Sequence, residues 1–176
     1  IHDRTSAKIF TVKTSTGGVP TAVAGDTDWS LFRAYTSLFN AESHAENTGI
    51  DAALRDFDTW SDGKDLVAAN QVWNLACYAD AADTVYNYWA GWVTGPNHYV
   101  RIFTPYLSSE VGVTQRHSGT LDTSKFRLYR TTNGSSVSAM KITHDYFRIE
   151  GLQFHEAADD GASASLDFEF IGMGNY

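Results

Sequence analysis

Short runs of apolar, aromatic and β-branched residues dominate the sequence after Leu66, and this pattern constrains the fold more than any other feature. Such residues favour the pleated, half-buried setting of a β-strand. Polar links rich in Gly, Ser, Thr and Asn separate the runs and are typical of turns. The pattern predicts strands at residues 72–78, 98–104, 126–131, 146–154 and 166–171. The chain is therefore expected to be mainly β.

Apolar residues between positions 26 and 66 follow a helical period instead. One apolar stripe contains Ile50, Ala53, Leu54, Phe57 and Trp60. Thr48 and Asp51 resemble a capping box, and Gly63 supplies a stop signal. We predict one helix over residues 48–61 and another near residues 29–45. The stripe is interpreted as a core face rather than as a cofactor-binding surface.

The first residues predict an arm that precedes the domain. Residues 8–14 alternate in part between apolar and polar side chains, and a turn-rich Gly-Gly-Val-Pro link follows at residues 17–20. We therefore expect a leading strand within an N-terminal arm of residues 1–25, followed by a single domain over residues 26–176. The strand is expected to pair within its own subunit, and pairing with a neighbouring subunit is the alternative.

Composition narrows the class of protein. Hydrophobic residues make up 43% of the 176 residues and charged residues 19%, which indicates a folded chain with one core. Thirteen Lys and Arg against 21 Asp and Glu give a formal charge of -8, so nucleic acid is not an expected partner. No run approaches the ~20 apolar residues that a membrane span needs. The single Cys77 excludes an internal disulfide and is predicted to be a buried, unreactive thiol.

Four segments occur in an order that is found in a known family. They are YTSL at residues 35–38, DLVAA at residues 65–69, NHYVRIFTP at residues 97–105 and HDYFRIEGLQF at residues 144–154. Together they resemble the N-terminal portion of pectate-lyase-like right-handed parallel β-helix proteins, which include many uncharacterised bacterial and phage members. The likeness covers residues 35–154. It implies a short right-handed stack of parallel coils with one or two N-terminal capping helices.

The final segment of the resemblance supports this reading physically. Gly151 divides it into two strand-like pieces, as at a corner between adjacent faces of a coil. Stacked coils would bury Phe147, Ile149, Leu152 and Phe154 together. The stack is expected to be short, and stacked repeats need caps at their ends. We expect the early helices to cap one end and a partner subunit to cover the other.

Members of this family that cleave polysaccharide use clustered carboxylates that bind calcium and a basic residue that removes a proton from the sugar. Neither feature maps residue by residue onto this chain. The nearest candidates for calcium are two oxygen-rich loops, residues 155–161 and 78–83, but neither has the spacing of an EF-hand loop, and solvated turn acids are the preferred reading. The six His include no pair spaced as ligands on one helix, and no Gly-x-Ser-x-Gly motif occurs. We therefore predict no catalytic residue, no metal ligand and no cofactor.

Aromatic residues form the most suggestive unassigned feature, at 14% of the chain. They gather at Tyr86, Tyr88, Trp89 and Trp92. Tyr and Trp are enriched at interfaces and can stack on sugar rings, so these four are candidate contacts with protein or glycan, and core packing is the alternative. Asn133 lies in the only Asn-x-Ser sequon and is a candidate glycosylation site. With Gly134 it also favours a tight hairpin turn.

Two functions are compatible with these observations. The first is a non-enzymatic structural subunit of an extracellular or virion assembly, such as a capsid decoration, fibre or filament. Such a subunit would associate with copies of itself or with other structural subunits through its β-rich, aromatic-rich surface. The alternative is a polysaccharide-binding or polysaccharide-lyase-like module, which the resemblance and the aromatic cluster both favour.

Overall fold

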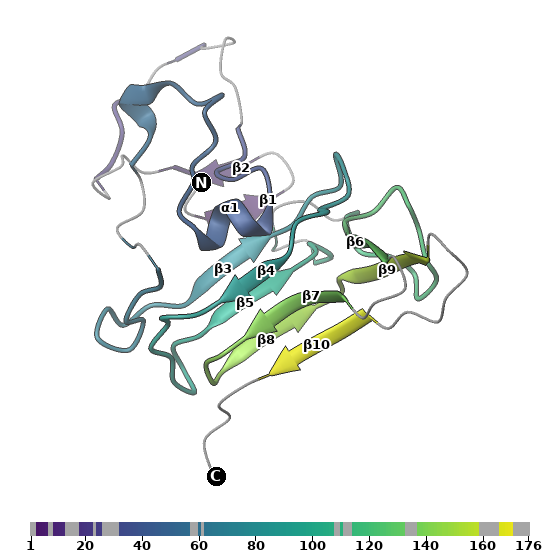
Figure 1. Ribbon diagram of the computed structural model, residues 1–176. Helices are drawn as coiled ribbons and strands as arrows, with labels where there is room; N and C mark the ends of the chain where they lie inside the picture. The colour runs from purple at the N-terminus through teal and green to yellow at the C-terminus, as the bar shows by residue number, and fades with distance from the viewer. Residues whose placement is uncertain are drawn as a thin grey trace.

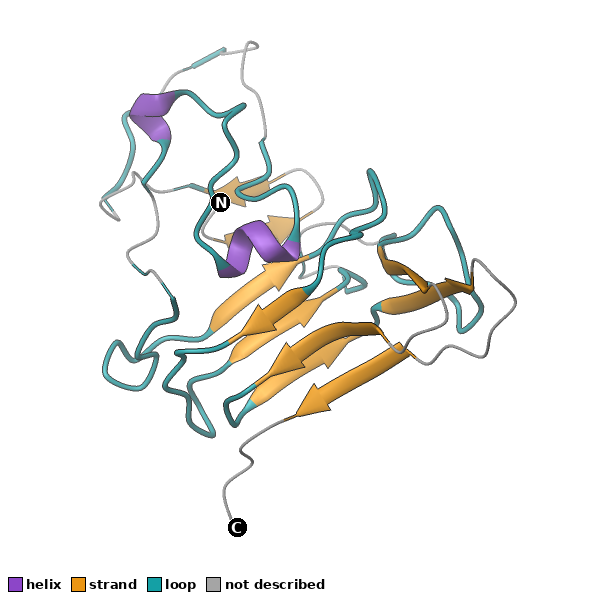
Figure 2. Ribbon diagram, viewed as in Figure 1, coloured by secondary structure: helices purple, strands orange, loops and turns teal. Residues whose placement is uncertain are grey.

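The computed structural model confirms a mainly β protein with one short α-helix. It describes residues 3–6, 9–12, 18–22, 24–25, 32–56, 60, 62–107, 110, 114–132, 137–158 and 166–170. The helical elements are α1 (Leu38–Glu42) and the 3-10 helix η1 (Ala52–Leu54). The strands are β1 (Asp3–Ser6), β2 (Ile9–Thr11), β3 (Trp73–Ala76), β4 (Asn87–Trp89), β5 (Val100–Phe103), β6 (Arg127–Thr132), β7 (Val137–Ile142), β8 (Phe147–Glu150), β9 (Gln153–Ala158) and β10 (Leu166–Phe170) (Figures 1 and 2).

Three small parallel sheets make up the body of the molecule. Their strand orders are β3-β5-β8, β4-β7-β10 and β6-β9. The chain visits these sheets in the same order each time: β3, then Asp83, then β4; next β5, β6 and β7; last β8, β9 and β10. We call these three stretches the first, second and third pass. In the first pass Asp83 takes the place of a strand, because it forms a parallel bridge with Leu128 of β6.

Apolar side chains at equivalent positions of successive passes stack to form the core. Trp73, Val100 and Phe147 are paired in register across β3, β5 and β8, and a second row contains Leu75, Ile102 and Ile149. Val100 and Ile102 of the middle pass are completely buried. Strand residues alternate between the two faces of a sheet, so these rows point inward. Asn74, Arg101 and Arg148 form the adjacent outward row.

The corner predicted at Gly151 is present. β8 ends and β9 begins on either side of this glycine, whose φ is +70°. Leu152 is buried, whereas Phe147, Ile149 and Phe154 are partly buried and pack against the core. The four side chains expected to be buried together therefore all contact the core, but three of them are not fully covered.

The segment before β3 covers the end of the stack that the first pass forms (Figure 1). Leu38, at the start of α1, donates its backbone N–H to the Oδ2 atom of Asp83 at 2.7 Å. The ring of Tyr35 meets that of Trp73 edge-on, with centroids 6.5 Å apart, and Trp60 packs on the same ring at 4.4 Å. This arrangement agrees with the predicted N-terminal cap. The helix in it is only five residues long, and no helix among the described residues has the length and hydropathy to cross a membrane.

The helix predicted over residues 48–61 is wrong. Of the described residues in this range, only those of η1 are helical, because Arg55 is extended and Asp56 has a φ of 69°, in the left-handed region that ends a helix. Leu54, placed on the core stripe by its spacing, is 67% exposed, whereas Trp60 is buried. A helix this short gains little without packing, and the tertiary contacts of Trp60 outweigh local propensity.

The helix expected near residues 29–45 is reduced to α1. Residues 29–31 lie outside the described part of the chain, as does Phe57 of the stripe. Ser37 caps α1 by accepting a hydrogen bond from the Asn40 N–H at 3.0 Å. The start of the helix is therefore set by a nearby capping residue, whereas its length depends on contacts with residues distant in the sequence.

The described residues of the N-terminal arm form two strands rather than one. β2 lies within the predicted strand at residues 8–14, and it pairs antiparallel with β1 in a sheet of their own. The leading strand therefore pairs within its own subunit, as expected. β1 was not predicted from the sequence.

Two further strands were missed, and one predicted turn does not join a hairpin. β4 was taken only as an aromatic cluster, and β7 lacked the apolar density of the other runs. β6 and β7 flank Asn133 and Gly134, but they lie in different sheets, because each pairs with strands of other passes. A tight antiparallel hairpin between them is thus ruled out. Residues 133–136, including the candidate glycosylation site Asn133, lie outside the described residues.

We predict that Gly91→Ala lowers the free energy of unfolding by about 3 kcal/mol or more, as measured by urea denaturation. Gly91 has a φ of +73°, and a Cβ atom there would overlap the backbone carbonyl oxygen of Asp62. Gly119→Ala is the matched control, because its φ is +103° but a Cβ atom would meet nothing within 4 Å. The control should cost only about 1–2 kcal/mol of backbone strain. Equal losses in the two variants would contradict the packing described.

Candidate functional site

Four tryptophans form one cluster inside the molecule, next to the N-terminal cap. We call Trp60, Trp73, Trp89 and Trp92 the tryptophan cluster. The rings of Trp73 and Trp92 are stacked, with centroids 4.8 Å apart and an interplanar angle of 15°. Trp89 lies 5.9 Å from Trp73 and 5.5 Å from the third-pass residue Phe147. The cluster therefore joins the cap to the first pass and to Phe147 of the third pass.

Burial decides between the alternatives for the four aromatic candidates. Trp89 is completely buried and Trp92 is 5% exposed, which corresponds to core packing rather than to a protein or glycan contact. Tyr86 is half-buried, and Tyr88 is 45% exposed. Alternation along β4 explains the difference, because neighbouring residues of a strand point to opposite faces. Of the four, Tyr88 alone presents a largely exposed ring.

His144 lies beside the cluster, 6.5 Å from Trp92 and 5.3 Å from Phe147 between ring centroids. Burial lowers the pKa of His144 to about 4, because the charged imidazolium would lose its hydration. The imidazole is therefore neutral near pH 7.

Cys77 is buried as predicted, and burial raises the pKa of its thiol far above the usual range. An un-ionised buried thiol is a poor nucleophile.

The first oxygen-rich loop, residues 78–83, serves structure in this fold. The Oδ atoms of Asp83 accept hydrogen bonds from the backbone N–H groups of Leu38 at 2.7 Å and Val85 at 3.2 Å. Burial nevertheless raises the pKa of Asp83 above its usual value. Asp80 forms an ion pair with Arg33. Both carboxylates are thus occupied by contacts between the first pass and the cap segment.

The second loop, residues 155–161, is described only in part, since residues 159–161 lie outside the described residues. The ring of His155 meets that of Tyr129 edge-on, with centroids 5.0 Å apart. Within the described residues, no three His, Cys, Asp or Glu side chains come together in a group that could hold a metal ion. Calcium binding therefore gains no positive support from these residues.

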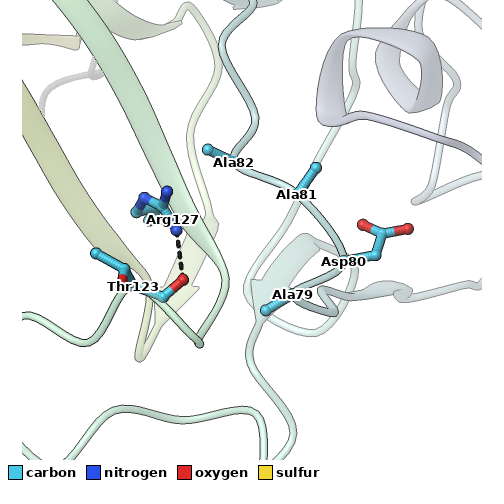
Figure 3. Close-up of a pocket in the computed structure, with 6 residues that line it drawn as sticks. All are labelled: Ala79, Asp80, Ala81, Ala82, Thr123 and Arg127. Atoms are coloured by element: carbon cyan, nitrogen blue, oxygen red, sulfur yellow. Dashed lines mark hydrogen bonds between the residues drawn. The ribbon is translucent and has the colours of Figure 1, made fainter.

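A small pocket lies where the first pass faces the beginning of β6. It measures about 140 Å³ and is lined by Ala79, Asp80, Ala81, Ala82, Thr123 and Arg127 (Figure 3). The Arg127 guanidinium donates to the Thr123 carbonyl oxygen at 2.6 Å rather than being directed at a ligand. The volume is well below that of pockets that enclose drug-sized ligands. Besides three alanine methyl groups, the lining offers the Arg127 guanidinium, the Thr123 hydroxyl and the carboxylate of Asp80, which is already paired with Arg33.

Arg101 forms ion pairs with two carboxylates, those of Glu150 and Glu110, on the outer face of β5. Its Nε and Nη2 atoms donate to the two carboxylate oxygens of Glu150 at 2.9 and 2.5 Å. Nη2 also donates to Glu110 at 2.9 Å. The other oxygen of Glu110 accepts the backbone N–H groups of Tyr106 at 2.7 Å and Leu107 at 2.9 Å. These contacts fasten the segment between β5 and β6 to the sheet.

All three groups of this cluster are charged at neutral pH. The hydrogen bond from Arg101 is the main cause that lowers the pKa of Glu150. Burial would raise the pKa of Glu110, but the backbone N–H groups of Leu107 and Tyr106, and then Arg101, bring it below its usual value. Hydrogen bonding to Glu150 chiefly raises the pKa of Arg101. A general acid needs a raised carboxyl pKa, so this cluster acts as a clamp and not as a proton donor.

The sequence interpretation did not single out the cluster. Arg101 and Glu150 both lie within segments of the family resemblance, but neither belongs to a recognisable motif. The parallel pairing of the two strands that carry them, β5 and β8, could have been found by aligning Val-Arg-Ile-Phe at residues 100–103 with Phe-Arg-Ile-Glu at residues 147–150. This alignment is the register that the structure has. Glu110 gave no signal in the sequence.

The edge of the third pass is the most extensive unpaired feature of the described strands. β8, β9 and β10 each pair with a strand of the second pass and with no other described strand. Thr104 donates its backbone N–H to the Glu150 carbonyl oxygen at 3.0 Å, so the backbone groups of Glu150 face β5. Backbone groups alternate in direction along a strand, so those of Ile149 face away from β5. No described strand pairs with them.

Comparisons with known proteins give no relative for this chain. No family model matches it, and neither the curated proteins nor the solved structures contain a match. The resemblance to pectate-lyase-like β-helix proteins therefore remains a prediction from the four segments quoted above.

We predict that Trp89→Ala destabilises the protein by about 3–5 kcal/mol, because it removes a completely buried ring from the tryptophan cluster. Tyr88→Ala is the matched control at the neighbouring position, and it should change the free energy of unfolding by no more than about 0.5 kcal/mol. Urea denaturation measures both values. A comparable loss in the two variants would contradict the assignment of Trp89 to the core and Tyr88 to the surface.

Proposed function

We propose that this chain is a non-enzymatic structural subunit of an extracellular or virion assembly. In this proposal its body is a short right-handed parallel β-helix of three coils, and it associates with other subunits through the edge of the third pass. The observation that carries the proposal is the difference between the two ends of the stack. The outer strands at both ends have only one described strand neighbour each. At the first pass, however, Tyr35 and Trp60 of the N-terminal segment pack on Trp73, whereas the proposal assigns the edge of β8, β9 and β10 to a partner subunit.

The β-helix assignment is supported by the repeated path of the chain. Each pass runs through the three sheets in the same order, and equivalent strands pair in parallel. Parallel crossover connections are right-handed in almost all proteins, which supports that hand for the coil. The apolar rows from Trp73 to Phe147 and from Leu75 to Ile149 are the stacked interior expected of such coils. The sheets themselves are small, with two or three strands each.

Burial supports an association at the edge of the third pass. Val100 and Ile102 of the middle pass are completely buried, whereas their third-pass neighbours Phe147 and Ile149 are only partly buried. Another strand placed below β8 would cover these side chains and accept the backbone hydrogen bonds of Ile149. An unpaired strand edge readily adds a strand from another chain. This edge replaces the aromatic surface as the proposed region of contact.

A structural role also agrees with the chemistry of the described residues. Both carboxylates of the Arg101 cluster are held by the same guanidinium, and their pKa values are lowered. Catalytic carboxyl pairs instead separate their pKa values, so that one remains protonated. The extracellular or virion setting is part of the proposal and derives from the resemblance.

We expect wild-type protein at micromolar concentration to form a dimer or larger species in light scattering. Ile149→Pro should be monomeric, because proline lacks the N–H that faces the open edge. Ile149→Ala is the matched control: it loses the same packing but keeps this N–H, so it should still associate. Circular dichroism confirms that each variant is folded. A monomeric wild-type protein would refute the proposal.

A polysaccharide-binding module is the second candidate, and Tyr88 is the observation that favours it. Its ring is 45% exposed on the outer face of β4, and the Nζ atom of Lys141 on β7 lies 5.7 Å from the ring centroid. An exposed aromatic face beside a cation can stack on an acidic sugar ring. A polysaccharide lyase would require, in addition, a base that the Arg101 cluster does not provide.

We expect calorimetric titration with acidic and neutral polysaccharides to separate the two candidates. If the second is correct, an acidic polysaccharide binds to wild-type protein and Tyr88→Ala weakens binding at least tenfold. The control Tyr146→Ala removes another ring, 40% exposed, from a different surface position. Absence of binding across the panel, with and without calcium, would eliminate the glycan function.

A further inference from the structure

We infer that the edge of the third pass binds the same edge of a second copy of this chain, with β8 antiparallel to β8 of the partner subunit around a two-fold axis through Ile149. This inference rests on the proposed function and specifies its partner and register. The backbone, the side-chain pattern and the covered first pass each contribute to it.

The backbone of β8 permits one kind of two-fold register. The backbone groups of Phe147 and Ile149 face the open edge, because those of Arg148 and Glu150 face β5. In an antiparallel pair, directly opposed residues either exchange two hydrogen bonds or none. A two-fold axis at Ile149 makes this residue and the partner's Ile149 a hydrogen-bonded pair. Both of its backbone groups, which have no described strand to pair with, are then satisfied.

Charge selects this register over its neighbours. With the axis at Ile149, Arg148 lies opposite the partner's Glu150, and the symmetry produces this pair twice. Both side chains belong to the outward face of the sheet, whereas Ile149 belongs to the inward face. An axis at Arg148 would instead oppose two arginines, which is unfavourable. A slip by one residue would set inward side chains against outward ones.

The side chains at these positions are available for the contact. Arg148 is exposed, and its guanidinium carbon lies 3.7 Å from the centroid of the Tyr99 ring, which orients it. Glu150 is engaged by Arg101 through one hydrogen bond to each carboxylate oxygen, and its side chain remains 37% exposed. A carboxylate has about four acceptor sites, so Glu150 can accept from a second guanidinium. Glu150 would then form ion pairs with both Arg101 of its own subunit and the partner's Arg148.

The covered first pass limits the assembly to two subunits. Head-to-tail stacking would place the third pass of one copy against the first pass of the next, but α1, Tyr35 and Trp60 occupy that end. The association that remains joins two identical surfaces. Such an isologous contact closes on itself and forms a dimer rather than a filament.

Cysteine pairing tests the register directly. Arg148 and the partner's Glu150 form a non-hydrogen-bonded antiparallel pair, with Cα atoms about 4.5 Å apart, within the range of a disulfide. We expect a mixture of full-length Arg148→Cys and Glu150→Cys proteins to oxidise to a disulfide-linked heterodimer, while one native Arg148–Glu150 contact is kept. Each variant alone should form no cross-link, and wild-type protein, whose Cys77 is buried, is the blank.

The other outcomes are distinct. Cross-linking of Arg148→Cys alone would overturn the register, and a dimer in light scattering without the mixed disulfide would overturn the inference while leaving the proposed function intact. A monomeric wild-type protein would overturn both.

As a second measurement, Arg148→Glu should weaken dimerisation at least tenfold, whereas Lys141→Glu, an equal change of charge on the middle-pass strand β7, should leave it unchanged. Equal effects of these two variants would also overturn the inference.

Discussion

Parallel pairing between successive passes is the interaction on which the rest of this structure depends. Because β3, β5 and β8 run in the same direction and in register, each side chain lies above its counterpart in the next pass. The interior is therefore built from rows rather than from isolated contacts. A residue in the middle of a row is covered on both sides, as Val100 and Ile102 are, whereas a residue at the end of a row depends on something else to cover it.

The two ends of the rows have different surroundings. At the first pass the tryptophan cluster receives Trp60 and Tyr35 from the N-terminal segment, and Asp83 accepts the backbone N–H of Leu38. At the third pass the rows end in Phe147 and Ile149, beside backbone groups that face away from the sheet. Because the two ends differ in this way, we infer that the third-pass end associates with another subunit. The difference also explains why the proposed contact uses a strand edge and not the aromatic residues.

Strands were predictable where apolar residues are dense, and less so elsewhere. The runs that became β3, β5, β6, β8 and β10 were all recognised, and Gly151 was recognised as a corner. β4 was missed because its three residues include both a core ring, Trp89, and a surface ring, Tyr88, so that the aromatic density suggested a binding surface. The helix over residues 48–61 failed because periodicity records only which residues could share a face. It does not record whether Trp60 has a better partner elsewhere.

The candidate site depended still more on tertiary structure. Arg101, Glu110 and Glu150 share no recognisable motif, and they are brought together by the pairing of β5 with β8 and by the segment after β5. The register explains why apolar and charged residues alternate over Phe147, Arg148, Ile149 and Glu150. The same four residues then supply inward apolar groups, outward charges and a free backbone edge.

The sequence by itself determined the mainly β class, the buried thiol of Cys77 and the corner at Gly151, because each follows from local preferences or from the character of one short segment. Tertiary structure alone decided which rings are buried, which carboxylates share Arg101 and which strands remain unpaired. The physical reason is that these properties depend on contacts between residues about 25 to 50 positions apart, as in the pairing of Trp73 with Val100 and of Val100 with Phe147. Local propensity carries no information on such contacts.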